Sequence, residues 1–315
     1  MDRRLFLAST LALAACGQTV AQPVIQATPL KSLVPFPVGT AAMAGQFDDA
    51  AWVDLCLTHC SQLTPEWEMK MEYILQGPDR FLWDAPDRIA DFCTTHGLRL
   101  HGHALVWYSQ GAEVFGGLDR RAFVAAFDRY IAEVAGRYRG RVNGWDVVNE
   151  AVAEDGNGLR DCHWSEVLGQ DGYIARAFEQ AKEADPDAVL FLNDYNLENN
   201  PVKGATFLRL VERMLGRGVP IGGIGTQSHL DIEIPAGQIT AFFREAAQFG
   251  LPIHMSELDA SLRREGRIDT RSHRQKIEQQ IGRVRELAEA FMDLPPAQRH
   301  AFTLWGLRDT DSWLR

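Results

Sequence analysis

The chain has 315 residues, of which 46% are hydrophobic and 23% are charged, a composition typical of a folded globular protein. Its formal net charge of −10 at pH 7 argues against a nucleic-acid partner, because a polyanion is bound by a basic surface. A neutral ligand fits this charge. The length allows one large α/β domain or two smaller domains.

The first 21 residues have the features of an export signal. Arg3 and Arg4 precede an apolar run, residues 5–15, that is too short to cross a bilayer, and the arginine pair resembles a twin-arginine signal. Small apolar residues precede Cys16 as in a bacterial lipobox, and cleavage near Ala21 is the alternative. We therefore expect an exported protein in the periplasm or at the cell surface, with a lipid on Cys16 as its membrane contact.

Residues 22–37 are rich in Pro, Thr, Gln and Val without a clear period, which predicts a tether. No second linker follows, so residues 38–315 are expected to form one catalytic domain. The remaining cysteines permit disulfides in an exported protein, but the sequence does not choose among the possible pairings. A zinc site is the weaker interpretation, because no two of them form a C-x-x-C pair. These cysteines are Cys56, Cys60, Cys93 and Cys162.

Short β-rich runs alternate with amphipathic helical patterns along the domain. Strands are predicted at 38–42, 62–65, 98–106, 142–148, 189–193, 222–227, 253–257 and 302–306. Helices are predicted at 48–60, 86–96, 119–138, 172–184, 201–215, 236–249 and 270–292, with start signals at Asp119, Asn200 and Asp269. This alternation predicts a (β/α)₈ TIM barrel with parallel strands and right-handed connections.

The predicted barrel lacks its final helix, because the chain stops at Arg315, soon after the last predicted strand. Without an eighth helix, we expect apolar surface of the last strand and its neighbours to stay open. Burial of such surface is worth about 25 cal/mol per Å².

Two glutamates stand at predicted strand ends. Catalytic residues of TIM barrels lie at the carboxyl ends of the strands, where the loops converge. Glu150 follows the fourth predicted strand and Glu257 ends the seventh. Glycoside hydrolysis uses two carboxyl groups that flank the bond, one as proton donor and one as nucleophile or base. This pair therefore indicates a glycoside hydrolase, which requires no metal and no cofactor.

Several motifs in order resemble glycoside hydrolase family 10, the barrel xylanases. They are residues 66–70 (EWEMK), 102–107 (GHALVW), 145–150 (WDVVNE), 223–229 (GIGTQSH), 257–259 (ELD) and 303–306 (TLWG). The resemblance implies an endo-1,4-β-xylanase that works with retention, with Glu150 as acid/base and Glu257 as nucleophile. Retention predicts that the two carboxyl groups lie about 5–5.5 Å apart. Xylan or xylo-oligosaccharides would be the partner of a monomeric enzyme.

The same resemblance implies the sugar-binding residues. Glu66 and Lys70 would bind hydroxyls on the non-reducing side, His103 and Trp107 would line the −1 subsite, and Asn149 would meet the 2-hydroxyl. Gln227 and His229 would support the nucleophile side, and Trp305 and Trp313 would close over the sugar. Asp259 lies two residues beyond Glu257 on the same strand face, so it is expected to orient His229.

Other interpretations of these residues stay open. Lys70 could form a helical i,i+4 ion pair with Glu66, and the histidines and tryptophans could belong to the core. The family commonly has Asn where this chain has Trp67 and His where it has Tyr108, so the glycone subsites are expected to differ.

Three other functions are compatible with the sequence. A preference for short xylo- or gluco-oligosaccharides is one alternative. A metal-dependent amidohydrolase, suggested by His101 and His103 in H-x-H spacing, is another. The third is a sugar-binding protein without strong catalysis.

Overall fold

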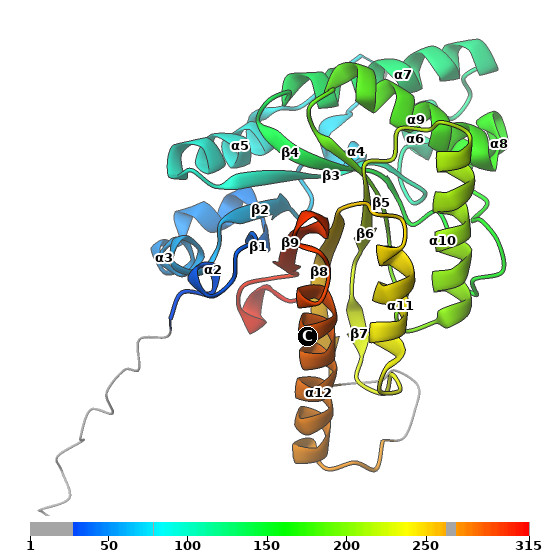
Figure 1. The fold of residues 1–315 in the computed structure, drawn as a ribbon. Helices are drawn as coiled ribbons and strands as arrows, with labels where there is room; N and C mark the ends of the chain where they lie inside the picture. Colours follow the sequence, from blue (N-terminus) through cyan, green and yellow to red (C-terminus); the bar gives the residue numbers. More distant parts are fainter. Residues whose placement is uncertain (1–27, 78, 263–268, 315) are drawn as a thin grey trace, which may run out of the picture.

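The computed structural model describes residues 28–77, 79–262 and 269–314. Parallel strands form a closed barrel (Figure 1). The first strand, β1, pairs with the last strand, β9, and β6 pairs with β8, so the ring of strands has no open edge. The predicted TIM barrel is therefore confirmed. The barrel strands are β1 (Val38–Ala42), β2 (Gln62–Pro65), β3 (Arg99–Trp107), β4 (Val142–Asn149), β5 (Val189–Asp194), β6 (Gly223–Thr226), β8 (Ile253–Ser261) and β9 (Arg299–Leu304).

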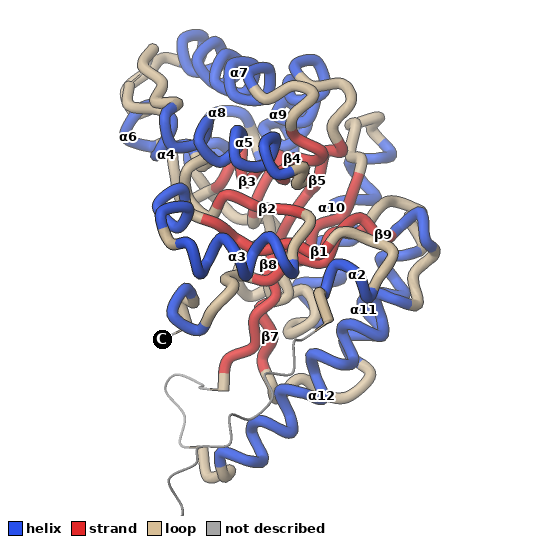
Figure 2. The backbone as a smooth tube through the Cα atoms, turned by 90° about the vertical axis from the view of Figure 1, so that its left-hand side faces the viewer, coloured by secondary structure: helices blue, strands red, loops and turns tan. Residues whose placement is uncertain are grey.

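The helix predicted in each crossover is present and lies outside the ring of strands (Figures 1 and 2). Side chains of Asp49, Asp119 and Asn200 accept hydrogen bonds from the first turns of their helices, as N-caps do. The crossover helices are α3 (Ala50–His59), α5 (Asp84–His96), α7 (Arg120–Arg137), α9 (Gln170–Ala184), α10 (Pro201–Gly216), α11 (Gln238–Ala247) and α12 (His273–Met292).

The predicted start of the last crossover helix was wrong. Ser272 caps α12, and its side chain and that of Gln275 form a reciprocal capping box. Asp269 instead forms ion pairs with Arg271 and Lys276.

Several short elements were not predicted. Strand β7 (His229–Asp231) pairs with the outer end of β8, so these two strands extend beyond the barrel (Figure 2). The others are α2 (Leu30–Leu33), α4 (Met71–Ile74), α6 (Ala112–Phe115), α8 (His163–Leu168) and the 3-10 turns η1 (Ala44–Asp48), η2 (Pro296–Gln298) and η3 (Asp309–Asp311).

The apolar core fills the layer between the strands and the helices. Trp52, Trp145 and Trp164 are fully buried there. Burial of one large apolar side chain is worth about 1.5–3 kcal/mol. The barrel interior is polar by comparison, and His101, Asp146 and His254 are fully buried within it.

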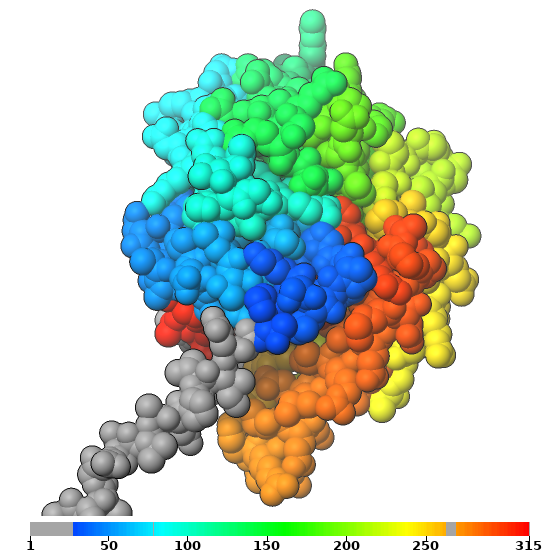
Figure 3. Space-filling view, turned by 60° about the vertical axis from the view of Figure 1, so that its left-hand side comes forward, coloured from blue at the N-terminus to red at the C-terminus, as the bar shows by residue number. Residues whose placement is uncertain are grey.

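The first described residues lie against the barrel domain. Helix α2, within the stretch for which the sequence suggests a tether, contacts α3 through a bond from Leu30 N to His59 Nδ1 of 3.3 Å. Figure 3 shows this dark-blue segment on the surface between the blue α3 region and the orange α12 region. The predicted signal segment, with Cys16, lies outside the described residues.

An apolar groove opens beside β9, the last strand of the described chain, where the sequence predicts open apolar surface. In the chain as described, up to Leu314, the turn η3 is the helical element that follows β9. The groove has a volume of about 170 Å³. It is lined by Leu30, Leu33, Val34, Phe36, Val38, Ala288, Met292, Phe302 and Leu304.

Cys56, Cys60, Cys93 and Cys162 are buried free thiols. No disulfide therefore joins them in this structure. Within the described ranges, none of the helices has the length and apolar character needed to span a bilayer.

Candidate active site

Glu150 and Glu257 both lie at the carboxyl ends of barrel strands. Glu150 directly follows β4, and Glu257 belongs to β8, the seventh strand of the ring. The backbone of Glu150 has a φ of 60°, in the left-handed region that non-glycine residues rarely adopt. Such a conformation costs of order 1–3 kcal/mol and clusters at functional sites. The donation from Glu150 N to Asn193 O at 2.8 Å holds this turn in place.

One hydrogen-bond network joins the two carboxylates. The Nδ2 group of Asn193 donates to Oε1 of Glu257 and to Oδ1 of Asn149, each at 3.0 Å. Asn149 in turn donates from Nδ2 to Oε1 of Glu150 at 3.0 Å. Gln227 donates from Nε2 to the same Glu150 oxygen at 3.0 Å, while its carbonyl accepts from Glu257 N. The side chain of Gln227 thus contacts Glu150, and its backbone contacts Glu257.

The surroundings of Glu257 favour its ionised form. Burial by itself would raise the pKa of Glu257, but the nearby His103, His229 and Lys70 outweigh burial and lower that pKa. Nε2 of His229 lies 3.4 Å from Oε2 of Glu257. An ionised carboxylate is the form that a nucleophile needs.

His229 is held as a cation. Burial would lower the pKa of His229, but the carboxylates of Asp259 and Glu257 more than compensate and raise it to about 10. Nδ1 of His229 lies 2.9 Å from Oδ2 of Asp259, the arrangement that the sequence suggested for these two residues. Asp259 also accepts a hydrogen bond from Nε1 of Trp313 at 2.7 Å.

Trp107 and Lys70 form another wall of the site. Trp107 donates from Nε1 to Oε2 of Glu150 at 2.9 Å. The ammonium of Lys70 lies 4.2 Å from the ring centre of Trp67 and 4.9 Å from that of Trp107, within cation–π range. Burial lowers the pKa of Lys70, and the carboxylates of Glu257, Glu150 and Glu66 oppose this shift. Residues 66–70 are not helical, so the helical i,i+4 ion pair is excluded.

Burial raises the pKa of Glu66, with Lys70 acting in the opposite direction. His103 is buried, and its Nδ1 lies 2.8 Å from Oδ2 of Asp146. The ring centre of Trp305 lies 5.4 Å from that of His103 and 6.4 Å from that of His229. Trp313 is 60% exposed and its ring lies 5.4 Å from His229. The site therefore has one enclosed aromatic side and one exposed aromatic edge.

A hollow of about 250 Å³ lies beside His229 and Trp313. It is lined by polar groups of Asn196, Asn199 and Asp259 as well. Sugar hydroxyls need such donors and acceptors, and aromatic faces suit the C–H faces of a pyranose.

Asn193 and Arg160 are contacts of the site that the sequence did not assign. Asn193 is the last residue of the strand predicted at 189–193, and no role is predicted for its side chain. Its Oδ1 accepts a hydrogen bond from Ser256 Oγ at 2.8 Å, which orients the amide so that Nδ2 faces the carboxylates. Arg160 donates from Nε to the carbonyl of Glu150 at 3.2 Å and stacks over the ring of Tyr108 at 4.0 Å. Arg160 stands in no strand-end motif, so the sequence offered no signal for it.

The model of glycosyl hydrolase family 10 matches residues 30–315. The chain belongs to glycosyl hydrolase family 10. Among curated relatives, endo-1,4-beta-xylanase A of Cellvibrio japonicus is 34% identical over 90% of this chain. Endo-1,4-beta-xylanase B of Paenibacillus barcinonensis is 35% identical over 81% of this chain and 80% of its own length. The resemblance found in the motifs is thereby confirmed.

Solved structures of family 10 proteins share this barrel. A thermostable mutant of a xylanase from Cellvibrio japonicus superposes with a TM-score of 0.83 at 32% identity, over 90% of each chain. A mutant solved in complex with xylotriose gives a TM-score of 0.83 at 31% identity, over 91% of this chain and 90% of that one. The chain spans a smaller part of several long relatives, 51% of the Cellvibrio enzyme and 25% of endo-1,4-beta-xylanase A from Thermoanaerobacterium saccharolyticum.

Proposed function

We propose that this chain is an endo-1,4-β-xylanase that hydrolyses internal xylosidic bonds with retention, Glu257 being the nucleophile and Glu150 the acid/base. The observation that carries the proposal is the pair of carboxylates at the barrel mouth, joined by the hydrogen bonds of Asn193, Asn149 and Gln227. Family membership supports the reaction class, and relatives named xylanases support the substrate.

The first step forms a glycosyl-enzyme ester. An oxygen of ionised Glu257 attacks the anomeric carbon, and the bond from that carbon to the leaving oxygen breaks while Glu150 protonates this oxygen. The bond from Trp107 to Oε2 and the bonds from Asn149 and Gln227 to Oε1 fix the carboxyl group of Glu150 during this transfer.

The second step releases the sugar. Glu150, now ionised, takes a proton from water, and the water oxygen attacks the anomeric carbon and expels Glu257 as carboxylate. The positive charge of His229, held by Asp259, stabilises the carboxylate that is regenerated. Two displacements restore the original configuration, and this stereochemistry predicts carboxyl groups about 5–5.5 Å apart.

We also propose the binding roles that the family resemblance implies, and the positions of these residues in the site support them. Glu66 and Lys70 bind hydroxyls on the non-reducing side, and His103, Trp107 and Asn149 surround the −1 sugar. Trp305 and Trp313 supply aromatic surface beside His229.

The experiment that tests this function is reducing-sugar release from xylan, cellulose and mannan by the wild type, Glu150→Ala, Glu257→Ala and the exposed control Glu183→Ala. Wild type and control should act on xylan best, and each active-site variant should lose more than about 1,000-fold in kcat. Equal loss in the control, or activity in Glu257→Ala, would contradict the assignment.

A second candidate function is hydrolysis of short xylo- or gluco-oligosaccharides. Trp67 and Tyr108, which stand where the family commonly has Asn and His, favour it. Trp67 lies beside Lys70 and Tyr108 beside Arg160, so both replacements change the surface expected to bind the sugar. Product analysis separates the two functions. An endo-acting xylanase lowers the viscosity of xylan before much reducing sugar appears, whereas an enzyme for short substrates does not. Sugar binding by folded protein without turnover would identify a binding protein.

We also propose that the protein is exported and held at the membrane by a lipid on Cys16, as a monomer. Lipobox-like residues before Cys16 support this proposal. Fatty-acid labelling of the wild type that is lost in Cys16→Ala, with the protein released from membranes, is the expected result. Labelling that persists in the variant would contradict it.

A further inference from the structure

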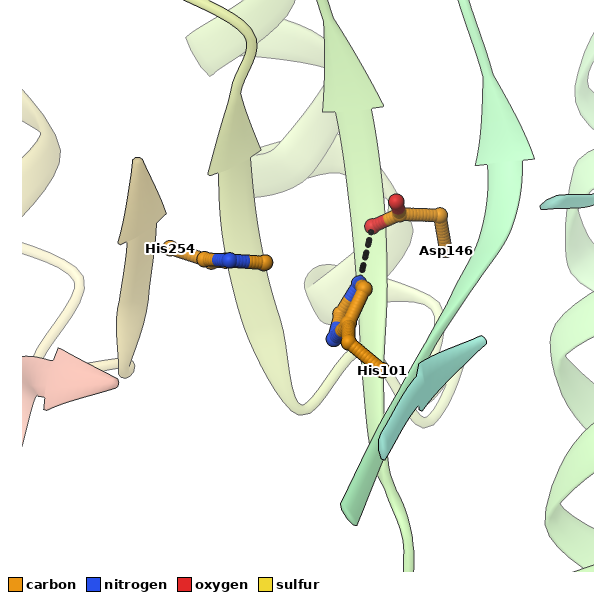
Figure 4. Close-up of side chains that lie close together, drawn as sticks. All are labelled: His101, Asp146 and His254. Carbon is orange, nitrogen blue, oxygen red and sulfur yellow. Dashed lines mark ion pairs between the residues drawn. The ribbon is translucent and has the colours of Figure 1, made fainter. Parts of the chain in front are cut away.

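Three side chains of types that can ligate a metal ion lie close together inside the barrel. His101 belongs to β3, Asp146 to β4 and His254 to β8 (Figure 4). All three are fully buried, and one potential ligand atom from each lies within 4.8 Å of the others. The rings of His101 and His254 are 4.3 Å apart at an interplanar angle of 67°.

Four polar atoms of this cluster have no hydrogen-bond partner. Nε2 of His101 lies 3.0 Å from Oδ1 of Asp146, yet neither atom has a hydrogen-bond partner of acceptable geometry. Nδ1 of His101 and Nδ1 of His254 also have none. A buried polar atom without a partner costs about 1–3 kcal/mol, so several at one place call for an explanation.

We propose that His101, Asp146 and His254 form a structural site for a divalent ion of the zinc type. Two imidazoles and one carboxylate are a common ligand set for Zn²⁺, with bonds of about 2.0–2.2 Å. A tetrahedral ion with such bonds holds its ligand atoms roughly 3.3–3.6 Å apart. In this structure one ligand atom from each residue lies within 4.8 Å of the other two, and Nε2 of His101 is 3.0 Å from Oδ1 of Asp146.

The neighbours of the cluster orient its members as they do around bound metals. The second oxygen of Asp146 lies 2.8 Å from Nδ1 of His103, and Nε2 of His254 lies 2.9 Å from Oγ1 of Thr303. Hydrogen bonds of this kind fix ligand rings and carboxylates. Through Asp146 and His103 the ion would also steady the floor of the −1 subsite.

A metal-free alternative exists within the same residues. In a metal-free protein, Nε2 of His101 and Oδ1 of Asp146 face each other directly at 3.0 Å. The positive charge of Arg99 opposes the binding of a cation at this cluster. Nη2 of Arg99 lies 3.4 Å from Nε2 of His300. The ring centre of His300 is 5.4 Å from that of His254. The two accounts differ in one measurable respect, the metal content of the folded protein.

The test uses tag-free protein produced in medium supplemented with Zn²⁺ or Co²⁺ and then passed through gel filtration. We expect about one metal ion per chain and a Co²⁺ visible spectrum without a thiolate charge-transfer band. We expect Tm to be higher by about 5 °C than in protein produced without added metal.

Matched variants locate the ion. His254→Gln, which keeps a donor for Thr303, and His101→Gln should each lose the metal and the Tm increment, while the exposed His273→Gln and the buried thiol variant Cys56→Ala keep both. Metal-free wild type, or equal metal content in wild type and His254→Gln, would overturn the proposal. These readouts do not depend on xylan hydrolysis, so they are independent of the proposed activity.

Discussion

Nδ1 of His229 lies 2.9 Å from Oδ2 of Asp259, and this contact controls the charge next to the proposed nucleophile. Burial alone would make the imidazole neutral, but the two adjacent carboxylates raise the pKa of His229 to about 10. The imidazolium in turn contributes to the lowered pKa of Glu257.

Replacing Asp259 by Asn should therefore shift the pH dependence of activity. The pKa of His229 falls when its carboxylate partner becomes neutral, and the pKa of Glu257 then rises because it loses part of its positive surroundings. We expect the acidic limb of kcat/KM to move up by about one pH unit. The measurement is kcat/KM on an aryl xylobioside from pH 3 to 10, with the exposed Asp293→Asn as control. An unchanged profile in Asp259→Asn would remove the positioning role.

Asn193→Ala should lower kcat more than it raises KM. The variant loses donations to Glu257 and Asn149 that fix both carboxylates, and removal of such a positioning contact costs about 10- to 100-fold. Asn143→Ala, exposed near the start of β4 at the other end of the barrel, is the matched control. Steady-state kinetics on xylo-oligosaccharides checks this, and a pure KM effect in Asn193→Ala would contradict it.

Lys203→Met should destabilise the fold in a pH-dependent way. Nζ of Lys203 lies 3.0 Å from Oδ1 of Asp194, with both side chains fully buried. Burial raises the pKa of Asp194 to about 6 although Lys203 opposes the shift. The stability that this raised pKa contributes is fully present when the pH is below the pKa of Asp in the unfolded chain, about 3.9. It is lost as the pH rises through the pKa of Asp194 in the folded protein, about 6.

Without Lys203 the pKa of Asp194 rises further. The free energy of unfolding therefore decreases more at pH 8, where Asp194 is ionised in the wild type, than at pH 5. Urea unfolding should show about 3–5 kcal/mol of destabilisation at pH 8 and clearly less at pH 5. The exposed Lys182→Met should change stability by less than about 0.5 kcal/mol at both values. A pH-independent loss in Lys203→Met would show that packing, not charge, explains the effect.

Trp67→Ala should weaken binding of longer substrates selectively. The indole lies 4.2 Å from the Lys70 ammonium and forms part of the wall expected to hold sugars on the non-reducing side. KM for xylotriose and longer chains should rise about 5- to 20-fold, because aromatic and cation–π contacts are worth about 1–2 kcal/mol. Activity on an aryl xyloside, which fills the −1 subsite alone, should stay within about twofold. Equal effects on both substrates would indicate that Trp67 stabilises the site and does not bind the longer substrates.

Most of the barrel was predictable because each strand and crossover helix has its own periodicity and cap. Asp119 and Asn200 show this, since both cap the helices that they were expected to begin. Strand β7 was missed because three residues are too few to show alternation, and it forms only where β8 extends beyond the barrel. Ser272 competes with Asp269 as a cap, and in the structure Asp269 forms local ion pairs with Arg271 and Lys276 instead.

The candidate site was predictable where a motif marks a strand end, as for Glu150, Glu257 and His229. Asn193 could not be assigned, because its role depends on lateral register: it pairs with Asn149 on β4 and with Gly225 on β6. The Lys203–Asp194 pair and the His101 cluster lie where local rules expect apolar side chains. Buried polar groups of this kind are recognised only when the partners brought by the fold are known.

The proposed mechanism requires Glu257 to form a covalent bond to the sugar. The most direct measurement is the reaction of Glu257→Ala with an activated aryl β-xylobioside in the presence of azide. The account predicts activity restored by azide and an α-configured glycosyl azide, because azide takes the place of the missing carboxylate. Absence of rescue in folded Glu257→Ala, together with an α-azide product from a Glu150 variant, would contradict the assignment of the nucleophile.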